Sequence, residues 1–61
     1  SEDDRKRSHL EAYKKVLNAS RKLYEALENP KTRLQQVENL VEQKIKAAEE
    51  LYEKTGMVWP L

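Results

Sequence analysis

Apolar residues recur at intervals of three and four over two segments of the chain, about residues 8–28 and 32–55. This spacing places side chains on one face of an α-helix, so it predicts two amphipathic helices in an all-α protein. The apolar stripe of the first helix consists of Leu10, Tyr13, Val16, Leu17, Leu23, Tyr24 and Leu27, bordered by Ala12, Ala19 and Ala26. The stripe of the second consists of Leu34, Val37, Leu40, Val41, Ala47, Ala48 and Leu51, bordered by Ile45 and Tyr52.

Capping signals suggest where these helices begin and end. Ser8 with Glu11 matches a capping box, while the acidic residues 2–4 favour an earlier start near residue 2, so both starts stay open. A turn is expected at residues 29–31, where Asn29-Pro30 also suits a helix start. A second box, Thr32 with Gln35, predicts the second helix from about residue 32. The only glycine, Gly56, is expected to end it in a left-handed conformation.

Two helices joined by so short a turn predict an antiparallel hairpin, with residues 1–61 forming one domain and residues 56–61 an apolar tail. The stripes are wider than the seam of a two-stranded coiled coil, so each helix is expected to contact two neighbours. We therefore expect a homodimer in which two hairpins form a four-helix bundle, or a hairpin that docks on a protein partner. In overall shape the dimer resembles small plasmid RNA-binding helical hairpins, without a shared sequence motif.

The expected partner interface follows the middle of both stripes. It consists of Leu10, Tyr13, Leu17, Tyr24, Val37, Val41, Lys44, Ala48, Leu51 and Trp59. Two polar residues interrupt the pattern near the middle of the stripes, Ser20 in the first helix and Lys44 in the second. Lys44 is interpreted as a lysine whose apolar stem lies in the seam and whose amine extends toward water, with a ligand or partner contact as the alternative. Ser20 is expected to hydrogen-bond to the backbone one turn earlier.

Composition narrows the function classes. The chain has 61 residues, no cysteine and one histidine, so disulfides and a conventional zinc site are not expected, and no cofactor is predicted. Two helices also form no water-excluding pocket unaided, so catalysis is not expected. Lys and Arg total 12 against 11 Asp and Glu, a balance that gives no strong field for polyanions. No apolar run approaches the length of a membrane span, and we expect a soluble, cytoplasmic protein that does not bind membranes.

A nucleic-acid interface is the main alternative to a protein interface. Lys14, Lys15, Arg21 and Lys22 are predicted to line one outer face of the first helix, where they would contact phosphates. Glu11, Glu25 and Glu28 interrupt this basic ridge. Glutamate and basic residues spaced one turn apart are also typical of an ordinary solvated helix surface.

The tail from Met57 to Leu61 is unusually apolar. In a hairpin it returns beside the first helix, so Trp59 is expected to cover Leu10 and Tyr13. Alternatively, Trp59 and Leu61 anchor in a groove of another protein, with Pro60 holding the segment extended. The sequence thus predicts a non-enzymatic interaction or oligomerisation module. Other origins remain open, namely a fragment of a larger assembly protein or an engineered helical binder.

Overall fold

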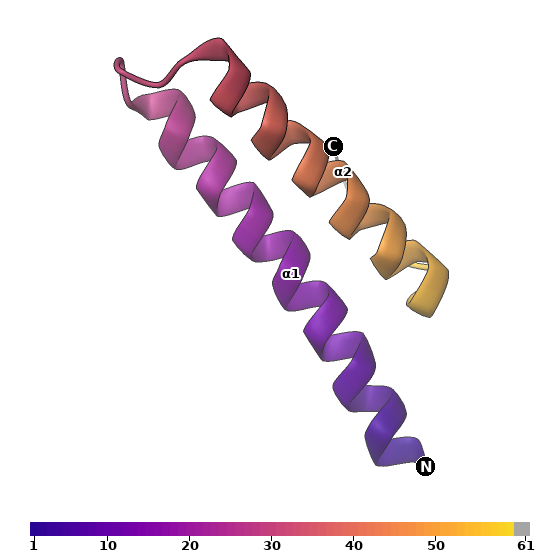
Figure 1. Ribbon diagram of the computed structural model, residues 1–61. Helices are drawn as coiled ribbons and strands as arrows, with labels where there is room; N and C mark the ends of the chain where they lie inside the picture. Colours follow the sequence, from indigo (N-terminus) through magenta and orange to yellow (C-terminus); the bar gives the residue numbers. More distant parts are fainter. Residues whose placement is uncertain (60–61) are drawn as a thin grey trace.

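The computed structural model describes residues 1–59 and contains two α-helices, α1 (Glu2–Glu28) and α2 (Leu34–Thr55). They run antiparallel and pack side by side along α2, while the first turns of α1 extend beyond the end of α2 (Figure 1). The predicted all-α hairpin is therefore confirmed, and the described residues contain no strand. The pairing of two such hairpins concerns a second chain and stays a prediction.

Helix α1 uses the earlier of its two predicted starts. The hydroxyl of Ser1 accepts a hydrogen bond from the Asp4 amide at 3.3 Å, which caps the first turn. The acidic side chains at residues 2–4 lie where the positive end of the helix dipole favours negative charge. The helix runs through Ser8, so the second predicted cap is not used.

Asn29 closes α1 and begins the connection. Its backbone N–H donates to the carbonyl of Ala26, and its side-chain oxygen accepts from the Lys31 amide at 2.9 Å. This side-chain bond holds the chain in a turn, a common role of asparagine outside helices. Asn29 is therefore a C-terminal cap of α1, and its predicted role as the N-cap of the next helix is wrong.

Helix α2 begins at Leu34, two residues later than predicted. The residue before it is Arg33, whose backbone N–H donates to the side-chain oxygen of Gln36 at 2.9 Å. Because an arginine side chain has no acceptor, only the glutamine half of a capping box is formed. The expected box between Thr32 and Gln35 is thus replaced by a contact one residue further along.

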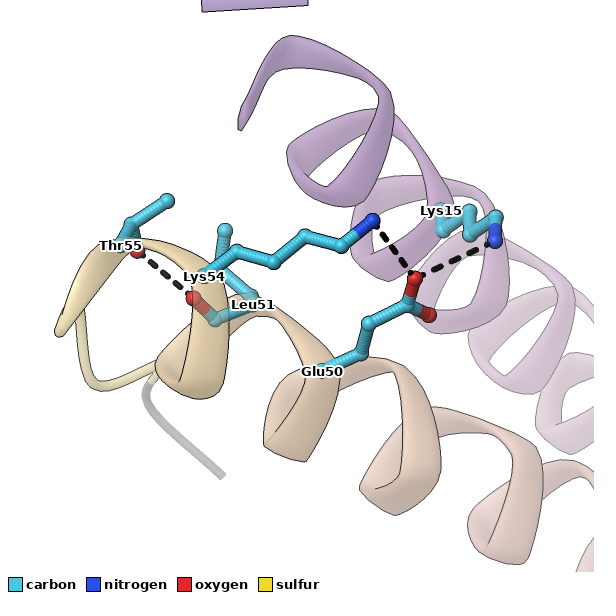
Figure 2. Close-up of polar contacts among 5 residues, drawn as sticks. All are labelled: Lys15, Glu50, Leu51, Lys54 and Thr55. Atoms are coloured by element: carbon cyan, nitrogen blue, oxygen red, sulfur yellow. Dashed lines mark hydrogen bonds and ion pairs between the residues drawn. The ribbon is translucent and has the colours of Figure 1, made fainter. Parts of the chain in front are cut away.

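Gly56 ends α2 in the left-handed conformation, with φ 74° and ψ 0°, as predicted. Its N–H donates to the carbonyl of Tyr52 at 2.7 Å. The hydroxyl of Thr55 donates to the carbonyl of Leu51 at 2.7 Å (Figure 2) and accepts from the Met57 amide at 3.0 Å. These bonds turn the tail back toward the hairpin. Pro60 and Leu61, the last two residues of the predicted tail, lie outside the described residues.

The seam between the helices is centred on small residues and two fully buried aliphatic ones. The buried residues are Ala12, Val16, Ala19, Ser20 and Leu23 on α1, with Lys44, Ala48 and Leu51 on α2. Val16 and Leu51 are 0% and 1% exposed and form the core with Ala12. Alanines allow the helix axes to approach closely, so Ala12 and Ala19, expected at the border of the first stripe, lie in the seam with Val16 and Leu23 from the stripe itself. Ser20 and Lys44, near the middle of the predicted stripes, are buried in it, whereas the larger stripe residues Leu10, Leu17 and Tyr24 lie outside it.

One edge of the seam is closed by charged side chains. Glu50 lies between two lysines, with its Oε1 3.0 Å from Lys54 Nζ on its own helix and 3.5 Å from Lys15 Nζ on α1 (Figure 2). The hydrogen bond from Lys54, and the charges of Lys15 and Lys54, lower the pKa of the Glu50 carboxyl. This edge is therefore polar and joined by ion pairs.

Candidate functional site

The opposite side of the seam carries several of the large apolar side chains that the hairpin leaves exposed. We call it the tail face and define it by Tyr13, Leu17, Tyr24, Ile45, Tyr52 and Trp59. Two shallow grooves run along it. Leu17 and Tyr24 line the groove on α1, Ile45 and Tyr52 line the groove on α2, and Trp59 lines both. The two helices thus contribute to one continuous surface.

The helical residues of the tail face share one position in the sequence relative to the seam. Each of its helical residues directly follows a buried seam residue: Tyr13 follows Ala12, Leu17 follows Val16, Tyr24 follows Leu23, Ile45 follows Lys44, and Tyr52 follows Leu51. One residue turns a right-handed helix by about 100°. In two antiparallel helices that face each other, the residues that follow seam residues on one helix therefore lie on the same side of the seam as those on the other helix.

The residues that directly precede seam residues have the opposite character. Apart from Ala47, which precedes Ala48, and Ala19, which itself lies in the seam, they are Glu11, Lys15, Asn18, Lys22, Gln43 and Glu50, and we call the surface that these six form the polar face. A residue one position before a seam residue lies on the side of the seam opposite to the tail face, where Lys15 contacts Glu50. The hairpin therefore has one polar face, on which Lys15 and Glu50 form an ion pair across the seam, and one face with large exposed apolar side chains.

Trp59 packs on the tail face, in the half distant from the connection. Its ring meets the ring of Tyr13 edge to face, with 5.6 Å between centroids and 68° between planes. It also packs against the core formed by Ala12, Val16 and Leu51. This is the predicted contact with Tyr13, whereas Leu10, the other residue that Trp59 was expected to cover, is 52% exposed. Pro60 and Leu61, part of the alternative docking prediction, lie outside the described residues.

The side chain of Lys44 extends from the seam to the tail face. Its side chain is buried, and its Nζ donates to the hydroxyl of Tyr24 at 3.4 Å, 5.1 Å from the centre of that ring. Among residues 1–59, no carboxylate forms an ion pair with it. The long stem lies in the seam, as predicted, but the amine ends at a phenol hydroxyl and not in open water.

Ser20 differs from its prediction. Its hydroxyl is buried and has no hydrogen-bond partner among the described residues, so the expected bond to the backbone one turn earlier is not made. Ser20 lines the α1 groove beside Leu17 and Tyr24. Its small side chain lets the groove reach the seam, and its oxygen is a polar atom in an otherwise apolar floor.

The predicted interface residues divide into two groups. Leu10, Tyr13, Leu17, Tyr24 and Val41 are exposed, while Val37 and Trp59 are half-buried. Lys44, Ala48 and Leu51 are buried by the hairpin itself, so they stabilise the single chain and offer little surface to a partner. Ile45 and Tyr52, which the sequence placed only at the border, belong to the exposed surface. The signal that identifies them is their position directly after seam residues.

The predicted basic ridge is divided between two sides of α1. Lys14 and Arg21 line a shallow hollow with Leu17 and Asn18, at the border of the tail face. Lys15 and Lys22 belong to the polar face, and Lys15 forms an ion pair with Glu50. Residues spaced by one lie on different sides of a helix, so the four cations do not form a single row.

Other kinds of site were also sought in the part of the chain that the structure describes. No three His, Cys, Asp or Glu side chains gather there to hold a metal ion. Neither α1 nor α2 combines the length and the apolar character that crossing a bilayer requires. When the chain was compared with protein-family models, curated proteins and solved structures, none of them matched.

Proposed function

We propose that this protein is a non-catalytic interaction module that associates with a second copy of itself through the tail face. The observation that supports the proposal is the row of large apolar side chains after the seam residues. Tyr13, Leu17, Tyr24, Ile45 and Tyr52 are 37–57% exposed, and all lie on one side of the hairpin. Contiguous apolar surface of this kind is typical of interaction sites.

The size of the chain supports the same proposal. Below about 70–80 residues, a single core rarely supplies more than about 3–5 kcal/mol, and small chains commonly gain stability from association. Among residues 1–59, only Ala12, Val16 and Leu51 form the fully buried core cluster. A second hairpin on the tail face would add a second layer of side chains over that core and over Trp59.

The available surface is large enough for a stable interface. A standard interface buries about 800 Å² on each partner. The accessible surface of the chain is 5055 Å², so such an interface needs about a sixth of it. One long side of a two-helix rod provides this share. The aromatic rings of Tyr13, Tyr24, Tyr52 and Trp59 are of the residue types that dominate the energetics of interfaces.

Sedimentation equilibrium over nanomolar to high micromolar concentrations tests the proposal. We expect the mass to rise from one copy to two as concentration increases. In the variant Ile45→Ser, the chain should stay monomeric over most of this range. The matched control is Gln43→Ser, which changes the polar face on the other side of Lys44 and should dimerise like the parent. A parent chain that is monomeric at every concentration contradicts the proposal.

The same experiment with added RNA examines the alternative interface. A complex with RNA that weakens steeply with salt, and that is lost in the variant Lys14→Glu/Arg21→Glu, would favour nucleic-acid binding through the border of α1. Assembly without nucleic acid, and unchanged when RNA is added, favours the proposed self-association.

A further inference from the structure

The two borders of the tail face carry opposite charges. On α1, Lys14 and Arg21 lie beside Leu17. On α2, Glu49 and Glu53 line the groove with Ile45 and Tyr52. The ion pairs found within residues 1–59 involve none of these four side chains. Glu49 and Glu53 are also one helical turn apart, a spacing at which like charges repel. The borders therefore hold charge that the single hairpin does not neutralise.

A basic border on α1 and an acidic border on α2 favour one orientation of the second copy over the other. We infer that the two hairpins pack with α1 of each beside α2 of the other, related by a twofold axis parallel to the helices, so that both connections lie at the same end. The inference rests on the proposed self-association and specifies its geometry. It places the basic border of each copy against the acidic border of the other.

The alternative twofold arrangement lacks this complementarity. An axis perpendicular to the helices, between the two hairpins, places α1 beside α1 and α2 beside α2, with the connections at opposite ends. Glu49 and Glu53 would then lie along the same acidic border of the second copy. Lys14 and Arg21 would likewise lie along a border that carries the same two cations. Like charges across an interface disfavour it, whereas opposite charges select the orientation.

The levels of the charged residues along the hairpin also agree with the parallel axis. Lys15 contacts Glu50 across the seam, so Lys14 lies level with the part of α2 that contains Glu49 and Glu53. A rotation about an axis parallel to the helices leaves every residue at its own level. Lys14 of one copy therefore lies level with these two glutamates of the other.

Not every charge near the border contributes to the attraction. Glu25 and Glu28 line the α1 groove beyond Arg21, closer to the connection. Glu42, on the facing border of α2, is already paired with Lys46 at 3.1 Å. The electrostatic attraction is thus concentrated in the half of the tail face that contains Trp59, distant from the connection.

Charge reversal distinguishes the two arrangements. With a parallel axis, Lys14→Glu/Arg21→Glu should raise the dimer dissociation constant about tenfold at low salt, because the attraction between the basic and acidic borders is lost on both sides of the symmetric interface. Glu49→Lys/Glu53→Lys should do the same. The chain with all four changes should return to within about threefold of the parent, because each border again faces its opposite. The control Lys22→Glu/Lys31→Glu changes the net charge equally away from the tail face and should leave the constant within about threefold.

Disulfide formation tests the geometry without relying on charge. The chain contains no cysteine, so Leu17→Cys and Ile45→Cys each introduce a single thiol. With α1 beside α2 of the second copy, oxidation of a mixture should link the two variants to each other, and neither variant to itself.

The outcomes separate this inference from the proposed function. If the parent is dimeric but its dissociation constant does not change when the border charges at Lys14, Arg21, Glu49 and Glu53 are reversed, the arrangement is overturned and self-association still stands. Crosslinking of either cysteine variant with itself, or no additional crosslinking on mixing, also overturns the arrangement alone. A parent that is monomeric at all concentrations overturns both.

Discussion

The Nζ of Lys44 donates to the hydroxyl of Tyr24 at 3.4 Å, which joins a seam residue of α2 to a tail-face residue of α1. Lys44 is 5% exposed, although an ammonium offers three donors and only this one acceptor is within reach among the described residues. A buried charge with so few partners costs stability, and a polar residue at a core position is a known way to fix the register of packed helices.

Replacing Lys44 with methionine should therefore stabilise the fold. Lys44→Met keeps most of the stem and removes the charge, so we expect the free energy of unfolding to rise by about 1–2 kcal/mol. Urea denaturation at one fixed protein concentration measures the change. Tyr24→Phe should lower stability by about 0.5–1.5 kcal/mol in the parent chain and by less in the Lys44→Met background. A less stable Lys44→Met chain would show that the hydrogen bond outweighs the cost of burial.

The core is small enough that one cavity should unfold the chain. Leu51 is 1% exposed and packs against Ala12 and Val16. Leu51→Ala should cost about 2–5 kcal/mol, comparable with the roughly 3–5 kcal/mol that so small a core supplies. Circular dichroism should show a large loss of helix at 25 °C. Leu34→Ala, at a residue that is 72% exposed, is the matched control and should change stability by less than about 0.5 kcal/mol. Retained helicity in Leu51→Ala would show that the core lies elsewhere.

The sequence predicted both helices and the hairpin, but not which part of each apolar stripe forms the seam. A stripe wider than one seam looks continuous on a helical projection, and large residues such as Leu17 and Tyr24 are expected to contribute most to the contact. Close packing instead places Ala12 and Ala19, which the sequence assigned to the border, in the seam beside Val16 and Leu23, since small side chains let the helices approach. Once the seam is known, the residues after it identify the tail face. That relation requires the structure, because the projection does not show where two helices touch.

The end of a helix could be predicted from the sequence only where one residue alone suited the cap. Gly56 ends α2 as expected, because no other residue there tolerates a left-handed backbone at low cost. At the start of α2, Thr32 and Arg33 each have a glutamine three residues later, so spacing could not choose between them. The structure uses Gln36, which accepts from the Arg33 amide. Competing hydrogen bonds of similar energy decide such boundaries.

The conformation of Gly56 predicts a substitution effect that involves no contact. Its φ is 74°, and a Cβ added there would meet no atom within 4 Å. Gly56→Ala should therefore cost about 1–2 kcal/mol through backbone strain alone. Gly56→Asn should cost less, because asparagine adopts this region more readily. Urea denaturation measures both, and equal stability of Gly56→Ala and the parent would mean that the tail can end the helix in another conformation.

Trp59 reports directly on the tail face. Its contact with Tyr13 and with the core predicts a fluorescence emission at shorter wavelength than that of an indole in water. Tyr13→Ala removes the edge-to-face contact and should shift the emission to longer wavelength, while Leu34→Ala should leave it unchanged. Aromatic pairs of this kind contribute about 0.5–1.5 kcal/mol beyond their buried area. Emission typical of free indole in the parent chain would contradict the packing of Trp59 on the hairpin.

The ion pairs of Glu50 predict how the polar edge responds to acid. Lys54, through its hydrogen bond and charge, and Lys15, through its charge, lower the pKa of the Glu50 carboxyl. A carboxyl with a lower pKa in the folded state contributes stability above its unfolded pKa of about 4.3. That contribution is lost as the pH falls through the lower folded value.

An NMR titration of the Glu50 side-chain carbon measures this pKa directly. In Lys54→Gln, the midpoint should rise toward the ordinary glutamate value, because the principal hydrogen bond and one positive charge are removed. Lys46→Gln is the matched control. Lys46 pairs with Glu42 one turn away, so its loss should leave the Glu50 midpoint unchanged. A Glu50 midpoint that responds equally to both variants would mean that general charge, and not the contact seen in Figure 2, sets the pKa of this carboxyl.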